Sequence, residues 1–145
     1  MFRKLVSISS TLMIAAACVV SAQAAGNVQL ERNAIMKNVG AATGVAARMV
    51  KGQMPFDAVA AQLAMRTMNS AALGFGYMFP EGTETGSKTR ASSKIWSDRA
   101  GFDAATAKFV KDTSAKVTDL ASLKAAFGAA ASNCGSCHKA YRLEK

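Results

Sequence analysis

A regular apolar stripe near the end of the chain restricts the fold more than any other feature of the sequence. Its members alternate three and four residues apart: Leu120, Leu123, Phe127, Ala130, Cys134, Cys137 and Tyr141. This spacing places side chains on one face of an α-helix and is typical of a helix packed inside a bundle. Two cysteines belong to the stripe, so we expect their sulfur atoms to face the interior of the bundle.

The preceding segments also have helical composition. Ala, Met, Leu and Lys are frequent after residue 24, the chain has only two prolines, and no alternating run of β-branched residues persists. The sequence predicts helices over about 28–53, 56–78, 94–118 and 119–142, with a long loop over 80–93. Four helices with one long connection predict an all-α, antiparallel four-helix bundle.

The N-terminus has the pattern of a secretory signal. Arg3 and Lys4 precede an apolar run over 12–20, and Ala22-Gln23-Ala24 is a small-x-small cleavage site. The apolar run is shorter than a membrane-spanning helix requires, so we expect no stable membrane insertion. We expect a signal peptide over 1–24 and one mature domain over 25–145. Lipoprotein processing at Cys18 is the alternative, although such sites usually have Leu where this chain has Ala15.

The mature chain is basic. Removal of the signal leaves 121 residues, and it lowers the basic residues from 18 to 16 against 9 acidic ones, a net charge of +7. This excess favours a partner protein with an acidic docking surface. We expect no nucleic-acid partner, because Lys and Arg are dispersed along the chain and export removes the usual target. Solvation of exposed helix faces is the alternative explanation of the charge.

Residues 134–138 form a C-x-x-C-H motif, and its histidine is the only one in the chain. This motif is the attachment signature of a c-type haem: two thiols add to the porphyrin vinyl groups and the imidazole coordinates the iron. On a helix, Cys134, Cys137 and His138 lie on one side and can reach one rigid ring. We therefore expect one covalently attached haem c inside the bundle, with His138 as an axial ligand. Because c-type haem is attached outside the bacterial cytoplasm, we expect a periplasmic location.

Zinc and dithiol chemistry are the alternatives for this motif. Structural zinc generally requires four N or S ligands, whereas the mature chain offers two Cys and one His. A thioredoxin-like dithiol begins a helix in a βαβ setting, whereas this motif lies late in a C-terminal helix. The sequence contains no Ser/His/Asp set, phosphate loop or second histidine, so we expect no enzyme activity. A purely structural bundle would leave the motif without a reason.

The motif extends to C-x-x-C-H-x-x-Y-R at Arg142, and in an exported helical chain it resembles the class II cytochromes c. That family includes cytochrome c′ and the low-spin cytochrome c-556. Shorter similarities follow in the family's order at 32–36, 50–57, 79–84 and 94–96. The resemblance covers essentially the whole mature chain and implies a haem-containing four-helix bundle.

The resemblance makes Met36 the residue that decides function. In the low-spin members a Met at this place supplies the sixth iron ligand, whereas in cytochrome c′ a bulky side chain leaves the iron five-coordinate. Arg32 and Met36 are four residues apart and face the same side of a helix, where the guanidinium could hold a haem propionate. Methionine is also an ordinary filler of helical cores, so the residues alone leave ligation open. The mature chain has six candidates: Met36, Met49, Met54, Met65, Met68 and Met78.

Other haem contacts are expected around this centre. The resemblance implies contacts of Thr83 and Glu84 with the haem edge. Arg142 lies four residues after His138 and is expected beside the imidazole or a propionate, with a solvated C-terminal Arg as the alternative. Aromatic residues could also line the haem, although such side chains pack in helical cores by default. They are Phe79, Trp96 and Tyr141.

Two functions stay open at this point. Ligation by Met36 predicts a His/Met electron carrier that exchanges electrons with redox partner proteins. Without that ligand, the iron would have an open site for NO or CO. Dimers occur among the resembled proteins, so a homodimer is also open.

Overall fold

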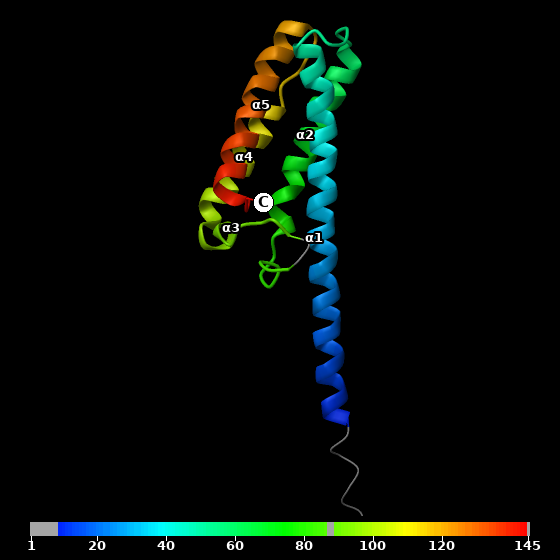
Figure 1. Cartoon of the computed structure of the whole chain (residues 1–145), viewed down its shortest axis with the longest axis vertical. Coiled ribbons are helices and arrows are strands. Elements are labelled where there is room, and N and C mark those ends of the chain that lie inside the picture. Colours follow the sequence, from blue (N-terminus) through cyan, green and yellow to red (C-terminus); the bar gives the residue numbers. More distant parts are fainter. Residues whose placement is uncertain (1–8, 87–88, 145) are drawn as a thin grey trace, which may run out of the picture.

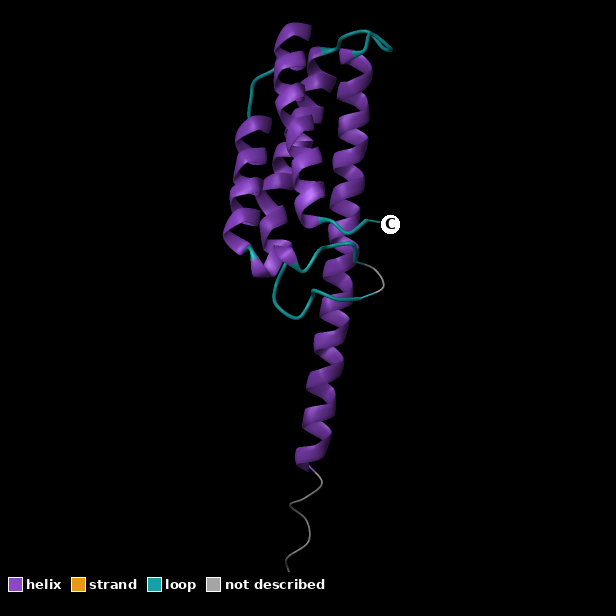
Figure 2. Ribbon diagram, turned by 60° about the vertical axis from the view of Figure 1, so that its left-hand side comes forward, coloured by secondary structure: helices purple, strands orange, loops and turns teal. Residues whose placement is uncertain are grey.

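The computed structural model describes residues 9–86 and 89–144, and this part of the chain is a bundle of helices (Figures 1 and 2). The helices are α1 (Ser9–Val50), α2 (Ala58–Phe75), the 3₁₀ turn η1 (Gly76–Met78), α3 (Lys94–Ser97), α4 (Arg99–Thr113) and α5 (Leu120–Tyr141). Arg3, Lys4 and Ser87, which the sequence places in the signal and the long loop, lie outside the described residues.

The four long helices pack in a closed ring. α1 contacts α2 and α5, and α4 contacts the same two helices from the other side. Within the described residues no β-strand forms, and the nearest approach to one is an isolated antiparallel bridge between Ala91 and Arg142. The predicted all-α four-helix bundle is confirmed.

Helix α1 differs from its prediction at both ends. It begins at Ser9 instead of near residue 28, and its N-terminal part extends beyond the other helices (Figure 1). The predicted signal segment, residues 1–24, contains no Gly or Pro, so it has no residue that would break the helix. The C-terminal end is at Val50 instead of Gln53, because Gly52 has a left-handed φ of 69°. The amides of Gly52 and Gln53 bond back to Met49 and Arg48, which closes a Schellman cap.

The prediction of one helix over 94–118 is wrong. Asp98 has non-helical φ and ψ angles of −126° and 55°, and it separates the short α3 from α4. Its carboxylate accepts a hydrogen bond from the Gly101 amide, so Asp98 acts as the N-cap of α4. Helix α4 then ends at Thr113, and 114–119 connect it to α5. The fourth helix agrees with the sequence to within one residue, and a capping box of Asp119 and Ser122 begins it.

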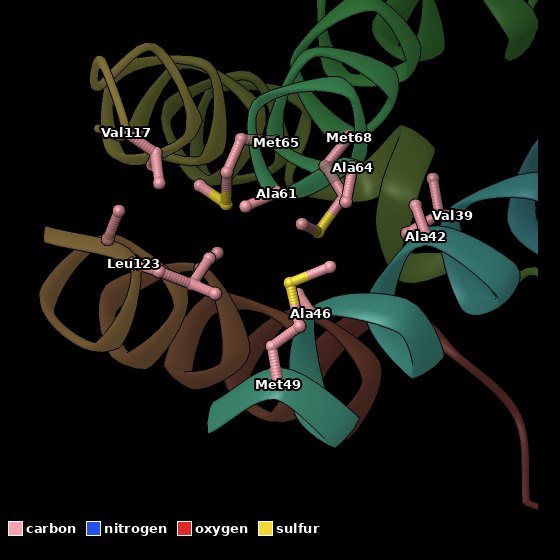
Figure 3. Packing of buried hydrophobic residues seen from close by; sticks show 12 residues of the cluster. Val39, Ala42, Ala46, Met49, Ala61, Ala64, Met65, Met68, Val117 and Leu123 are labelled. Atoms are coloured by element: carbon pink, nitrogen blue, oxygen red, sulfur yellow. The ribbon is translucent and has the colours of Figure 1, made fainter. Parts of the chain in front are cut away.

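The largest apolar cluster lies where α1, α2 and α5 meet, away from the long loop (Figure 3). Its centre is rich in methionine: Met49, Met65 and Met68 are at most 1 % exposed, and Leu123 is fully buried. Figure 3 shows these side chains pointing toward one another between the helices. A second cluster of Phe79, Ile95, Phe102 and Tyr141 packs under the loop. The described part of the core thus consists of two separate apolar clusters.

Among the residues that the structure describes, no helix combines the length and the hydropathy needed to cross a membrane.

Candidate haem site

A cavity of about 710 Å³ lies between the helices. Residues of all four long helices and of the connection that precedes α4 line it. Four of the residues predicted from the motif and from the first helix are among them: Met36, Cys134, Cys137 and His138. A cavity of this size is typical of sites for a cofactor or another small molecule.

The two cysteines are half-buried at the cavity wall. Burial raises the pKa of both thiols, and the neighbouring Cys134 raises that of Cys137 further. Dithiol redox centres depend on a lowered thiol pKa, so these residues lack the electrostatics of such a centre. The Cys134 thiol lies 3.5 Å from the Ala130 carbonyl oxygen one turn earlier. Across the described residues, no three His, Cys, Asp or Glu side chains converge as a metal site.

His138 lines the same cavity from α5. Burial lowers the pKa of its imidazole, and the positive charges of Arg142 and Arg90 lower it further. The neutral imidazole is the form that binds a metal.

The cavity has a positive lining. Arg32, Lys37, Arg90 and Arg142 contribute to it, and no carboxylate is found among the described lining residues. Haem carries two propionates, which such a lining would neutralise. Two thiols three residues apart, an adjacent imidazole and this positive lining therefore fit haem c.

Only one of the methionines that the structure describes outside the predicted signal lies at the cavity. Met36 is half-buried on α1 and belongs to the lining, whereas Met49, Met54, Met65, Met68 and Met78 do not. Met49, Met65 and Met68 fill the large core cluster instead. The structure therefore brings Met36 to the cavity that also contains His138.

Comparison with known proteins gives the family. The model of the family described as cytochrome c′ matches residues 27–142. The chain belongs to the class II cytochromes c. Cytochrome c-556 of Agrobacterium fabrum is 36 % identical over the whole of both chains. Covalently attached haem c is therefore the cofactor of this cytochrome.

Solved structures of the family share its fold. Cytochrome c′ from Rhodopseudomonas palustris has a TM-score of 0.77 and 37 % identity, covering 81 % of this cytochrome and 97 % of that protein. Oxidised cytochrome c556 of the same organism has a TM-score of 0.73 and 29 % identity over 83 % of this chain and 98 % of its own. Relatives of both types are thus similar to this cytochrome.

The three residues expected at the haem edge from the first helix and the loop have different surroundings. Arg32 lines the cavity, but its Nε donates to the Met78 carbonyl at 2.6 Å and its Nη1 to the Thr83 carbonyl at 3.0 Å. Thr83 is buried and accepts from Arg32 Nη2 through its hydroxyl. Glu84 accepts a hydrogen bond from the Gly82 amide at 3.0 Å. The structure does not bring Thr83 or Glu84 to the cavity lining.

Of the remaining predicted haem contacts, some line the cavity and one does not. Arg142 lines the cavity directly after α5, where its backbone pairs with Ala91. Phe79 and Tyr141 line the cavity, whereas Trp96 packs behind Phe79 and donates its indole N–H to the Pro80 carbonyl.

Asn133 and Arg90 are among the polar lining residues that sequence reasoning missed. Asn133 is buried at the cavity wall, and its amide donates to Asp112 at 2.8 Å. A signal for it existed, because Leu123, Ala126, Ala130, Asn133 and Cys137 form a second stripe spaced three and four residues apart. Arg90 also lines the cavity and donates to the Leu143 carbonyl, and nothing local in the sequence marks it.

Proposed function

We propose that this cytochrome is a low-spin, His/Met-ligated mono-haem electron carrier of the cytochrome c-556 type. The observation that carries the proposal is the position of Met36, the one described methionine among these six at the cavity of Cys134, Cys137 and His138. Haem c bound there supplies one-electron chemistry between Fe(III) and Fe(II).

Each residue has a distinct task in this proposal. Cys134 and Cys137 would hold the porphyrin by thioether bonds from α5, and His138 would supply one axial nitrogen. Met36, on α1, would supply a thioether sulfur as the second protein ligand of the iron. Iron that keeps the same two protein ligands in both oxidation states requires little structural rearrangement during electron transfer. An axial Met also raises the reduction potential. We expect the protein to bind no substrate.

The experiment compares Met36→Leu with Met54→Leu by optical and EPR spectroscopy of the oxidised protein. Both side chains are half-buried, and both pack against the large core cluster, but only Met36 lines the cavity. We expect a low-spin spectrum for the wild type and for Met54→Leu, and a predominantly high-spin spectrum for Met36→Leu. A high-spin wild type that Met36→Leu leaves unchanged would instead identify a five-coordinate cytochrome c′ with an open site for NO or CO.

We further propose that redox partners dock through an acidic surface. Support comes from the basic residues Lys37, Arg90 and Arg142 at the cavity lining. The test measures reduction by an anionic and by a cationic inorganic complex of similar potential over a range of salt concentrations. We expect the anionic complex to react faster and to slow as salt is added. Faster reaction with the cationic complex at low salt would contradict the proposal.

Export with cleavage after Ala24 is proposed for the N-terminus. The family match begins at residue 27, directly after the predicted mature start. The intact mass of the periplasmic protein should equal residues 25–145 plus one haem. A lipid adduct at Cys18, or a retained N-terminus, would overturn the proposal.

We also propose that α2 pairs with α2 of a second copy. The outward face of α2 and of the η1 turn that follows it carries four large apolar side chains, the α2 stripe, which are 78, 62, 59 and 83 % exposed. They are Val59, Leu63, Leu73 and Tyr77. The stripe is symmetric about Met68, so two antiparallel copies would place Val59 opposite Tyr77 and Leu63 opposite Leu73. Such self-complementarity is what a two-fold interface requires.

Sedimentation of the holoprotein at increasing concentration tests this pairing. We expect a dimer that the double variant Leu63→Glu/Leu73→Glu converts to a monomer. Leu143→Glu is the control, because Leu143 is 50 % exposed and lies outside both the stripe and the cavity lining. A wild type that stays monomeric throughout would overturn the pairing.

A further inference from the structure

The loop that follows α2 is fastened to α1 by one buried arginine. Arg32 is 5 % exposed, and three of its nitrogens donate to backbone or hydroxyl oxygens of Met78 and Thr83. Thr83 in turn donates from its hydroxyl to the Pro80 carbonyl at 2.7 Å, which closes the turn. One planar side chain therefore joins the two ends of the 78–83 segment.

The same guanidinium stacks on the aromatic wall of the cavity. It lies 4.3 Å from the centre of the Phe79 ring and 5.5 Å from that of Trp96. Phe79 is buried, lines the cavity and makes edge contacts with Phe75, Trp96 and Phe102. A planar cation that bonds through its edge and stacks through its face holds a ring in one position, which an ammonium group cannot do.

A second contact one turn earlier on α1 continues this fastening. Gln29 is 6 % exposed and donates to the Thr85 carbonyl at 2.7 Å. Gly86 has a φ of 140°, and a Cβ there would lie 2.7 Å from Gln29 Oε1. A side chain at residue 86 would therefore meet the amide end of the Gln29 side chain, and the positive φ also favours glycine at this position.

From these contacts we propose that Arg32 is a positioning residue that holds the 78–86 segment against α1 and so fixes Phe79 as a wall of the haem cavity. This role differs from that of a counter-charge for a propionate, because most of the donors of Arg32 are already used by the segment. This inference depends on the proposed electron-carrier function only for the measurement of the reduction potential. The expected consequence of losing it is water entry at the Phe79 side and a lower reduction potential.

The test uses Arg32→Lys, Arg32→Met and Gly86→Ala in the holoprotein, with haem attachment checked by mass. Trp96 is the only tryptophan, so its indole N–H gives one NMR signal, and that N–H donates to Pro80 within the segment. We expect its hydrogen exchange to accelerate about tenfold in all three variants, as the loss of roughly one to two hydrogen bonds allows. We also expect the potential to fall in all three. Arg48→Met, an exposed arginine of the same helix, should change neither value.

The variants separate positioning from charge. Arg32→Lys keeps the positive charge, and Gly86→Ala changes no charge at all. If Arg32→Lys preserves both values, or if Arg32→Met lowers the potential while Gly86→Ala and the indole exchange stay at wild-type values, the proposal is overturned and Arg32 acts as a counter-charge. A wild type without haem, or with high-spin iron, would overturn the proposed electron carrier but leave the indole exchange as a test of this inference.

Discussion

Tyr141 donates its phenolic hydrogen to the carboxylate of Asp98 across 3.0 Å. Tyr141 ends α5 three residues after His138, and Asp98 caps the start of α4. The Ser92 amide bonds to the Tyr141 carbonyl at 3.0 Å, so the same residue also binds the loop before α3. The helix of the haem motif, the long loop and the start of α4 are therefore joined at one point.

Replacement of Tyr141 by Phe should lower the thermal midpoint by a few degrees, because the bond to a charged acceptor is lost while the ring still packs on Phe102. Tyr77→Phe is the matched control, since Tyr77 is the only other tyrosine, is 83 % exposed in the single chain and keeps its apolar ring for the proposed α2 pairing. Thermal unfolding followed by circular dichroism measures both. Equal midpoints for the two variants would show that the bond contributes nothing to stability.

Gly101→Ala should destabilise the protein although Gly101 lies inside a helix. A Cβ at this position would lie 2.6 Å from both Asp98 carboxylate oxygens and from the Tyr141 hydroxyl. Forcing these groups apart should lower the free energy of unfolding by about 1–3 kcal/mol. Denaturant unfolding with linear extrapolation gives the value.

Gly128→Ala on α5 is the control for this glycine. A Cβ there meets nothing within 4 Å, so the gain in helix propensity should raise the free energy of unfolding by about 0.5–1 kcal/mol. Opposite signs for the two variants are expected. A higher free energy of unfolding in Gly101→Ala would show that Tyr141 and Asp98 can move apart without loss of stability.

The haem motif and the bundle could be predicted because their signals are local. Cysteine spacing on one helix face sets both the covalent chemistry and the buried side, and the structure places Cys134 and Cys137 at the cavity as that spacing implies. Met36 could be singled out only by family resemblance, since its sequence surroundings do not differ from those of a core methionine.

The break at Asp98 and the contacts of Arg32 could not be predicted in this way. Asp98 lies within a segment of continuous helical composition, and its partner Tyr141 is 43 residues away. Arg32 bonds to backbone carbonyls 46 and 51 residues away, whose positions depend on the folded loop. Hydrogen bonds to backbone groups carry no side-chain signature in the sequence, so spacing alone could place Arg32 only on the correct side of its helix.

Substitutions in the two apolar clusters should differ in whether they change the haem spectrum as well as the stability. Leu123 is fully buried in the large cluster and does not line the cavity, so Leu123→Ala should cost about 2–5 kcal/mol of unfolding free energy with an unchanged haem spectrum. Phe102 is 1 % exposed and lines the cavity, so Phe102→Ala should cost about 3–5 kcal/mol and also shift the Soret band. Denaturant titration and the visible spectrum test both. A shifted band in Leu123→Ala would mean that the two clusters are coupled.

Acid should remove part of the stability through Asp119, the N-cap of α5. Hydrogen bonds from the Ser122 amide, at 2.7 Å, and from the Ser122 hydroxyl lower the pKa of this carboxyl below its ordinary value of 3.8. The unfolded chain therefore binds the proton first as pH falls. The contribution of Asp119 is complete above about pH 4 and is lost as pH falls through the lower folded pKa.

Asp119→Asn isolates this effect, because asparagine caps a helix as well as aspartate but does not titrate. Its thermal midpoint should stay near the wild-type value at pH 7 and fall less between pH 5 and pH 3. Asp119→Ala should lower the midpoint across the whole range, since it has no capping acceptor. Parallel pH profiles for the wild type and Asp119→Asn would show that the bonds from Ser122 do not favour the ionised carboxylate. Helix α5 also carries Cys134, Cys137 and His138, so acid weakens the first turn of the same helix that holds the haem motif.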